Sequence, residues 1–374
     1  MNILVVTTSR ADYGIYHSLL TALQQSDIQY GLVVSGTHLS HRHGYTVAEI
    51  EQDGHPIATR ITAVPVDTHA ETIATTIGAT VQKFAAYWAT VHTTVDLIVV
   101  LGDRYEMFAA VTAAVPFNLP IAHIHGGETT LGAIDDKFRH AITAMSLLHF
   151  TSTRQYAERV VAMIGGRDHV HWVGAPSLDD IDTLSCYSID EMRAKFSIDF
   201  GVPSILVTFH PETVATSKNT FYATVLVETL STLSKRYQIV ITLPNADTEA
   251  EVIRGAFEAL SNSNRSVVTI ESFGKRGYFS ALRWAKLLIG NTSSGLLEAP
   301  SFGRYVVNVG DRQAGRVRSA NVIDAAVEEE AILNAVAAIE KCGYLYEGIN
   351  LYHKEGAAAV EIMHHIEQWH RSKS

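Results

Sequence analysis

Cysteine is almost absent from this sequence, with only Cys186 and Cys342 among 374 residues. Two cysteines support neither a disulfide framework nor a thiolate zinc site. Long apolar runs are missing too, because no stretch approaches the ~18 uninterrupted apolar residues that a membrane-spanning helix needs. The first residues enter a strand-like run directly, without the basic and apolar regions of a signal peptide. The sequence therefore predicts a soluble, cytoplasmic protein that does not bind membranes.

Positive charge is also scarce. Lys and Arg total 29 against 39 Asp and Glu, which gives a formal net charge of -10. A nucleic-acid backbone is held mainly by a cationic surface, so nucleic-acid binding is disfavoured. A small anionic substrate stays possible, because a few well-placed arginines can dominate the local field. The GxGxxG fingerprint of dinucleotide-binding folds does not follow the first apolar run.

Short, β-rich apolar runs alternate with helical patterns through the whole chain. Such near-continuous apolar runs are typical of parallel strands that are covered on both faces. The predicted strands are 3–7, 31–35, 97–101, 121–125, 149–152 and 170–174, then 204–209, 238–243, 266–270, 286–289 and 305–309. Because βαβ connections are right-handed, each set predicts a doubly wound sheet, and hence an α/β protein of two Rossmann-like domains.

Helical periodicity is clearest in a few segments, where apolar residues recur on one face. These segments are 15–23, 220–233, 331–339 and 356–369, and Ser188 is placed to cap a short helix over 190–195. The polar, acidic stretch between Pro176 and Pro203 is the predicted hinge. It separates a first domain, residues 1–175, from a second, residues 176–355.

Open parallel sheets bind ligands beyond the carboxyl ends of their strands, so post-strand residues are the candidates for a site. Arg10 follows the first strand and can clamp a phosphate, although it would also be an ordinary surface residue beside a helix capped by Asp12. Asp103 and Arg104 follow the third predicted strand. An aspartate there is either a helix cap or a carboxylate that accepts or orients a proton.

The segment HIHGGE, residues 123–128, is the richest in ionisable groups, and Asp135, Asp136, Arg139 and His140 follow it. Burying this many charges is costly unless they serve a purpose. The later residues also fit a solvated helix start with i, i+4 pairs. His123 and His125 are two apart and are expected on one side of a strand, but a metal site would require further ligands, so no metal is predicted.

In the second half, His210 stands at a strand end, and a GNTSSG segment runs from another strand into a helix. Hydroxyl groups and free N–H groups at a helix start form a cradle for an anion. Glu298, one turn into that helix, is placed to bind a ribose diol, although it also fits an ordinary first-turn acid. The remaining residues of this anion-binding group are Thr292, Ser293, Ser294 and Arg312.

Taken in order, the motifs SRADYG, GDRYE, HIHGGE, RHAIT, LHFTST, FHPET, GNTSSGLLEAP and GDRQAGR resemble the hydrolysing UDP-N-acetylglucosamine 2-epimerases of bacterial sialic-acid pathways. Each motif alone is weak, but the ordered set spans nearly the whole chain. The resemblance implies a GT-B-like fold, in which two Rossmann-like domains face each other across a cleft that binds UDP. It also implies that the last helix, within residues 356–374, packs back on the first domain.

The reaction that the resemblance implies converts UDP-N-acetylglucosamine and water to N-acetylmannosamine and UDP. UDP is eliminated to leave 2-acetamidoglucal, which is then hydrated with inversion at carbon 2. The implied acid–base residues are Asp103, Glu128 and Asp135, with a further role for His125, which some relatives replace by Glu. The implied substrate-binding residues are Arg10, Arg104, Arg139, His210, Thr292, Ser293, Ser294, Glu298 and Arg312, with His210 also a candidate for the chemistry. The resemblance implies no cofactor. It also implies that the protein forms a homodimer or a homotetramer.

Several activities compete with this one. The substrate can instead be UDP-N,N'-diacetylbacillosamine, and the loops at 37–45 and 129–133 are the expected sugar contacts that would decide. A non-hydrolysing epimerase would interconvert the two UDP-sugars, and a GT-B glycosyltransferase would leave carbon 2 unchanged. A UDP-sugar-binding regulatory protein would bind UDP without turnover, although the acid-rich HIHGGE segment argues against that.

Overall fold

A computed structural model of the chain describes residues 1–41, 44–63, 70–131, 134–181, 183–211, 218–244 and 250–373. The chain divides into two compact units. The first holds Met1–Thr129, Ile134–Asp180 and Tyr352–Ser374, and the second holds Thr130–Ala133 and Ile181–Leu351. None of the helices within the described ranges is both long and apolar enough to span a membrane.

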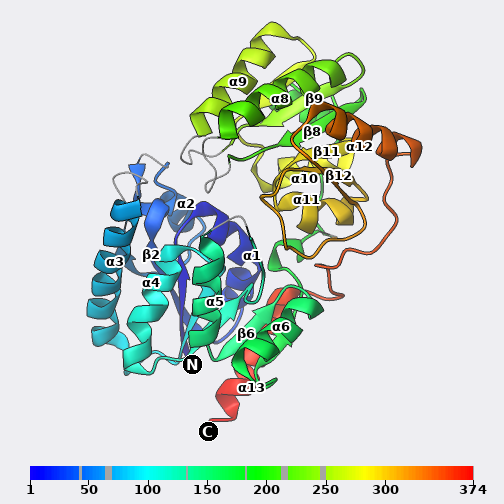
Figure 1. The fold of residues 1–374 in the computed structure, drawn as a ribbon. Helices are drawn as coiled ribbons and strands as arrows, with labels where there is room; N and C mark the ends of the chain where they lie inside the picture. The colour runs from blue at the N-terminus through cyan, green and yellow to red at the C-terminus, as the bar shows by residue number, and fades with distance from the viewer. Residues whose placement is uncertain are drawn as a thin grey trace. The chain divides into compact units, whose positions relative to one another are not determined.

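The first unit is built on a parallel sheet of seven strands among its described residues, in the order β3-β2-β1-β4-β5-β6-β7. This is the Rossmann strand order, extended by one strand. Figure 1 labels β2 and β6 of this sheet. The strands are β1 (Asn2–Thr7), β2 (Gln29–Ser35), β3 (Ile57–Ile61), β4 (Leu97–Leu101), β5 (Ile121–Ile124), β6 (Leu148–Thr151) and β7 (Val170–Trp172). Every residue of β4, β5 and β6 is buried, which is why these runs are apolar on both faces except at His123, His149 and Thr151.

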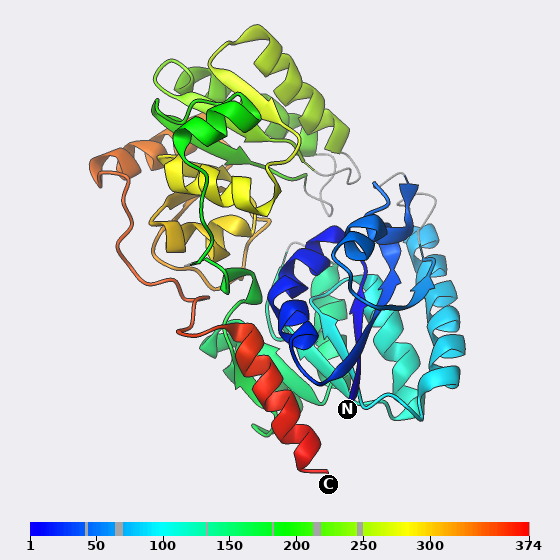
Figure 2. The same cartoon turned by 180° about the vertical axis from the view of Figure 1, so that it is seen from behind.

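Helices cover this sheet in layers. The contacts place α3, α4 and α5 next to one another, and α1 next to α13. The helices are α1 (Arg10–Gln24), α2 (Val47–Gln52), α3 (Ala70–Val91), α4 (Tyr105–Ala114), α5 (Asp135–Met145), α6 (Arg154–Ile164) and α13 (Ala358–Arg371). The last helix thus belongs to the unit formed by the start of the chain, and it is the red helix of Figure 2. Its buried Ile362, Ile366 and Trp369 are part of that unit's core.

The second unit repeats the plan with six parallel strands among its described residues, in the order β10-β9-β8-β11-β12-β13. The strands are β8 (Ser204–Thr208), β9 (Gln238–Thr242), β10 (Val267–Ile270), β11 (Leu287–Gly290), β12 (Tyr305–Val309) and β13 (Val322–Ala325). The helices are α7 (Ile189–Phe196), α8 (Asn219–Leu233), α9 (Ala250–Ser263), α10 (Gly274–Trp284), α11 (Ser294–Leu297) and α12 (Glu329–Lys341). Separate apolar clusters form on the two faces of the sheet.

The α/β class and the parallel sheets that the sequence predicted are confirmed. Two strands escaped prediction, and both lie at sheet edges: β3, which alternates exposed and half-buried residues, and the four-residue β13. The predicted cap is present, because the hydroxyl of Ser188 accepts from the N–H of Glu191 while the Glu191 carboxylate accepts from the N–H of Ser188. Asp12 does not cap α1. The N-cap is Ser9, and the Asp12 carboxylate accepts from the Thr8 and Ser9 side chains.

Candidate active site

The candidate acid–base residues gather at the carboxyl edge of the first sheet. Strands β4, β5 and β6 are neighbours there, so the residues that follow them come together. Asp103 follows β4, His125 and Glu128 follow β5, and Ser152 follows β6. Asp103 does not cap α4, whose N-cap position is Arg104 and carries no side-chain cap bond.

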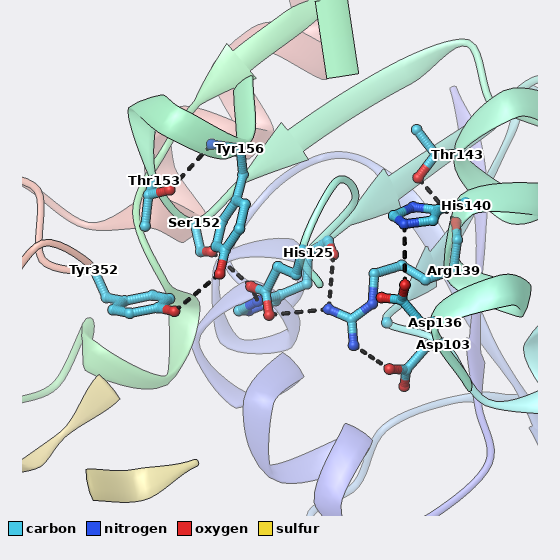
Figure 3. A network of polar contacts seen from close by, with 12 residues as sticks. Asp103, His125, Asp136, Arg139, His140, Thr143, Ser152, Thr153, Tyr156 and Tyr352 are labelled. Atoms are coloured by element: carbon cyan, nitrogen blue, oxygen red, sulfur yellow. Dashed lines mark hydrogen bonds and ion pairs between the residues drawn. The ribbon is translucent and has the colours of Figure 1, made fainter. Parts of the chain in front are cut away.

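Arg139 is the centre of this group. It is 3% exposed and projects from α5 between two carboxylates, as Figure 3 shows for Asp103. One terminal nitrogen donates to Asp103 Oδ2, and the other donates to Glu128 Oε2 at 2.9 Å. Burial alone would lower the pKa of Arg139, but the two carboxylates raise it above its ordinary value. The guanidinium is therefore charged and offsets negative charge that would otherwise be buried unpaired.

Glu128 is enclosed by the protein. It is 1% exposed, and its Oε1 lies 2.5 Å from His125 Nδ1 and 2.6 Å from Ser152 Oγ. His125 is buried as well and takes a left-handed backbone with φ 63°, which is uncommon for residues other than glycine, although His, Asn and Asp adopt it more often than the rest. Ser152 also belongs to this site. In the sequence it was only part of the LHFTST motif, and no role was predicted for it.

His123 differs from His125 although it is two residues away. The strand ends at Ile124, so the expected alternation does not extend to His125. The ring of His123 is buried, donates from Nε2 to the carbonyl of Gly102 at 2.8 Å and lies 3.1 Å from the hydroxyl of Thr143. Burial lowers its pKa to about 3, so it is neutral. His123 is a packed structural residue.

The two glycines after His125 leave room for neighbouring protein atoms. Gly127 has φ 75°, and a Cβ there would lie 2.7 Å from Val160 Cγ2 and 2.9 Å from the carbonyl oxygen of Tyr156. The loop thus runs against α6, which accounts for glycine at this position.

Arg104 is held by a glutamate that the sequence reasoning left unassigned. Glu106 is 0% exposed, and its carboxylate accepts two bonds from the Arg104 guanidinium, at 3.1 and 3.3 Å. The charge of Glu106 raises the pKa of Arg104 above its ordinary value. This fixed cation also acts on Asp135, the first residue of α5, and favours its ionised form.

Asp135 is nevertheless difficult to ionise. Burial, and then the nearby charge of Asp103, raise its pKa to about 6, with Arg104 and Arg139 opposing the rise. A carboxyl group with this pKa exchanges a proton near neutral pH, as an acid–base residue must. Asp136, next to it, instead lies 3.4 Å from His140 Nε2 on the same helix.

We expect Asp103→Asn to lower the pKa of Asp135, because the substitution removes a neighbouring negative charge. A carbon-13 NMR titration of the aspartate carboxyls measures it. The wild-type resonance should titrate near pH 6 and the variant resonance at lower pH. Between the ordinary carboxyl pKa and pH 6, Asp135 holds its proton more often in the folded protein than in the unfolded chain. The contribution of Asp135 to stability therefore falls as the pH rises through that window. If Asp103→Asn left the titration midpoint of Asp135 unchanged, the charge of Asp103 would not be a cause of its raised pKa.

The anion-binding candidates of the second unit gather at the carboxyl edge of its own sheet, where β8 and β11 pair. Asn291, 1% exposed, holds both chain segments together: its side chain accepts from the His210 N–H at 2.7 Å and donates to the His210 carbonyl at 2.8 Å. The carbonyl of Asn291 in turn accepts from Arg312 at 3.2 Å and from Gln313 at 2.8 Å. Asn291 and Gln313 position the predicted residues and were not themselves predicted.

His210 is neutral in this arrangement. Burial, and then the charge of Arg312, lower its pKa to about 3. A bound anion would favour the protonated ring and raise that pKa. The helix after β11 is α11, a single turn that begins at Ser294 and has Glu298 as its C-cap. Because it is so short, its dipole adds less to anion binding than the sequence pattern suggested. The amide of Ser294 bonds the hydroxyl of Thr292 at 3.3 Å.

Other predicted positions are accounted for individually. Arg10 begins α1 and is exposed. Residues 42–43 and 132–133 of the two expected sugar-contacting loops lie outside the described residues, as does Glu212 of the FHPET motif. Within the described parts of the chain, no three His, Cys, Asp or Glu side chains come together in a way that would hold a metal ion.

Comparison with known proteins then gives the family. The family model for UDP-N-acetylglucosamine 2-epimerase matches residues 21–367. The chain belongs to the UDP-N-acetylglucosamine 2-epimerase family. The resemblance drawn from its motifs is thereby confirmed at the level of the family.

Two relatives are about a third identical to this chain over the aligned residues. The polysialic acid biosynthesis protein P7 of Escherichia coli is 35% identical over 338 residues, which is 89% of this chain and 85% of that one. The hydrolysing UDP-N,N'-diacetylbacillosamine 2-epimerase of Legionella pneumophila is 34% identical, over 89% of this chain and 87% of that one. A UDP-GlcNAc 2-epimerase structure from Neisseria meningitidis has a TM-score of 0.83 at 18% identity, covering 98% of this chain and 100% of that one, and shows that the fold is shared.

Proposed function

We propose that this member of the epimerase family is a hydrolysing enzyme that converts UDP-N-acetylglucosamine and water to N-acetylmannosamine and UDP. One observation carries the proposal: a neutral-pH acid, Asp135, and the buried His125–Glu128 pair adjoin the Arg139-bound Asp103 within the first unit. Elimination of UDP needs one group to take the carbon-2 proton, and hydration needs another to return a proton to the opposite face.

The second unit is proposed to hold the diphosphate. Anion-binding groups lower the barrier when the departing UDP gathers negative charge, because preorganised donors stabilise charge as it develops. His210 and Arg312, which Asn291 holds in place, are the proposed donors, with Ser293 and the flanking hydroxyl residues beside them. Arg10 is the diphosphate contact proposed from the first unit.

Reaction in heavy water tests the function. Incubation with UDP-N-acetylglucosamine, followed by NMR, should yield equal amounts of free UDP and of N-acetylmannosamine with deuterium at carbon 2. Interconversion of the two UDP-sugars without net UDP would make the enzyme a non-hydrolysing epimerase. A released or transferred sugar that is unchanged and unlabelled at carbon 2 would point to a glycosyltransferase.

A second candidate substrate is UDP-N,N'-diacetylbacillosamine. It is favoured by the names of two relatives, the Legionella pneumophila protein and a Campylobacter jejuni GDP/UDP-N,N'-diacetylbacillosamine 2-epimerase that is 29% identical over 87% of this chain and 85% of that one. Parallel incubations with the two nucleotide sugars at equal concentration, scored by free UDP, decide between them.

Two substitutions separate binding from chemistry. Asp103→Asn should reduce kcat at least ~100-fold, the usual contribution of an acid–base group, with UDP affinity within threefold of the wild type. Arg10→Ala should weaken UDP binding by about 10- to 100-fold, since a hydrogen bond to a charged group contributes about 1.5–3 kcal/mol. Isothermal calorimetry with UDP and a UDP-release assay measure both. The exposed Arg167→Ala is the matched control and should change neither. Equal affinity losses in the first two variants would refute this division.

A further inference from the structure

The carboxylate of Glu128 has little capacity left for a substrate. Its Oε1 contacts His125 Nδ1 at 2.5 Å and accepts from Ser152 Oγ at 2.6 Å, and its Oε2 accepts from Arg139 at 2.9 Å. The residue is 1% exposed. Both oxygens are thus engaged by donors that the protein supplies. A carboxylate held in this way is a poor proton acceptor.

The imidazole of His125 has the opposite character. A carboxylate only accepts, so Nδ1 carries the hydrogen of this contact, and in the neutral imidazole Nε2 then carries a lone pair. Among the residues that the structure describes, Nε2 is buried and has no hydrogen-bond partner. Buried polar atoms are nearly always paired, so an exception of this kind asks for an explanation.

The backbone supports the same conclusion. His125 is held at φ 63°, a left-handed conformation that is uncommon for a residue with a side chain and that persists where the surroundings impose it. The contrast with His123 is direct, since both ring nitrogens of that residue meet protein atoms. In His123 both ring nitrogens have a protein partner, whereas in His125 the nitrogen Nε2 has none among the described residues.

We propose that Glu128 acts through His125, and that His125 Nε2 takes the carbon-2 proton in the elimination step. This proposal rests on the proposed function. As the proton passes to Nε2, the C2–H electron pair forms the C1–C2 double bond, and the C1–O bond breaks with its electrons leaving on UDP. The resulting imidazolium is stabilised by Glu128, which stays ionised throughout. Glu128 is then a positioning residue, and Ser152 and Arg139 position it in turn.

Double substitution tests the coupling. His125→Asn, which tolerates the left-handed backbone, and Glu128→Gln should each lower the rate of UDP release by ~10²–10⁴-fold. The double variant should lose no more than a fewfold beyond the worse single one, because residues that act as one unit are not additive. Glu158→Gln, an exposed glutamate paired with Arg167 on the surface, is the matched control and should stay within twofold of the wild type. Circular dichroism checks that each variant is folded.

Three results would overturn the proposal. One is multiplied losses in the double variant, which would mean that Glu128 meets the substrate independently. Another is UDP release by His125→Asn with accumulation of 2-acetamidoglucal, since elimination would then proceed without the imidazole. The third needs no turnover: nitrogen-15 NMR of the wild type should show neutral His125 protonated at Nδ1, and protonation at Nε2 would refute the pairing. A wild type that has this tautomer but releases no UDP from either sugar nucleotide would instead refute the proposed function.

Discussion

Replacing Arg139 by Met should lower the free energy of unfolding by about 3–5 kcal/mol, the usual cost of removing one partner from a buried charge pair. The residue is 3% exposed, and it bonds Asp103 and Glu128 at once. Methionine fills much of the same volume but leaves both carboxylates without their cation. Urea unfolding monitored by circular dichroism measures the change.

The surface offers a matched control for this substitution. Arg167 makes a two-bond ion pair with Glu158, at 2.7 and 3.0 Å, but both side chains are more than half exposed. Exposed pairs contribute about 0–1 kcal/mol, so Arg167→Met should change stability by no more than that. Similar losses in the two variants would show that burial does not govern the strength of the Arg139 pairs.

Lowering the pH should partly offset the loss of stability in Arg139→Met. Without the guanidinium, the carboxylates that it contacts are harder to ionise, so their pKa values rise above the wild-type values. A raised carboxyl pKa contributes stability at low pH that is lost as pH increases through it. Arg139→Met should therefore be relatively less destabilised at pH 5 than at pH 8, and unfolding at those two values checks it.

The second large effect is expected at Gly290, where β11 meets β8. Its φ is 149°, and a Cβ at this position would lie 1.9 Å from the carbonyl oxygen of Thr208. That oxygen belongs to the backbone of a central strand and cannot rotate away. Gly290→Ala should therefore force the two strands apart, with a loss of stability at or above the ~4–5 kcal/mol that marks an exceptional substitution. Thermal unfolding and soluble yield measure it.

A second glycine gives the comparison. Gly255 lies within α9, and nothing is within 4 Å of a Cβ built there. Gly255→Ala should raise stability by about 0.5–1 kcal/mol, because alanine loses less conformational entropy than glycine in a helix. Equal effects at the two positions would mean that the close approach of β11 to β8 is not what requires Gly290.

Much of the fold was legible in the sequence because buried parallel strands are apolar on both faces. The interior strands β1, β4 and β8 were predicted within a residue or so of their bounds. The edge strands β3 and β13 were missed, since an edge strand is half exposed and its polar residues interrupt the apolar run. The other two edge strands, β7 and β10, were predicted, so the edge position alone does not hide a strand.

The site was legible only in outline. The rule that ligands bind after parallel strands pointed to Asp103, His125 and His210. It could not say which side chains bond to one another at that edge. Arg139 bonds Asp103, 36 positions away, and Ser152 bonds Glu128, 24 positions away. No local pattern encodes such pairings, because they arise from strand order. Ser152 was therefore given no role in advance, and Arg139 was predicted as a substrate contact rather than as the partner of two carboxylates.

The return of α13 to the first unit affects how the protein is made. A ribosome releases the amino-terminal residues first, yet Ile362, Ile366 and Trp369 complete the apolar interior that those early residues begin. Until α13 has been synthesised, the part of α1 that packs against it in the first unit stays uncovered. All segments of the second unit have been made by then. Deleting α13 should thus destabilise the unit that is made first and lower its solubility.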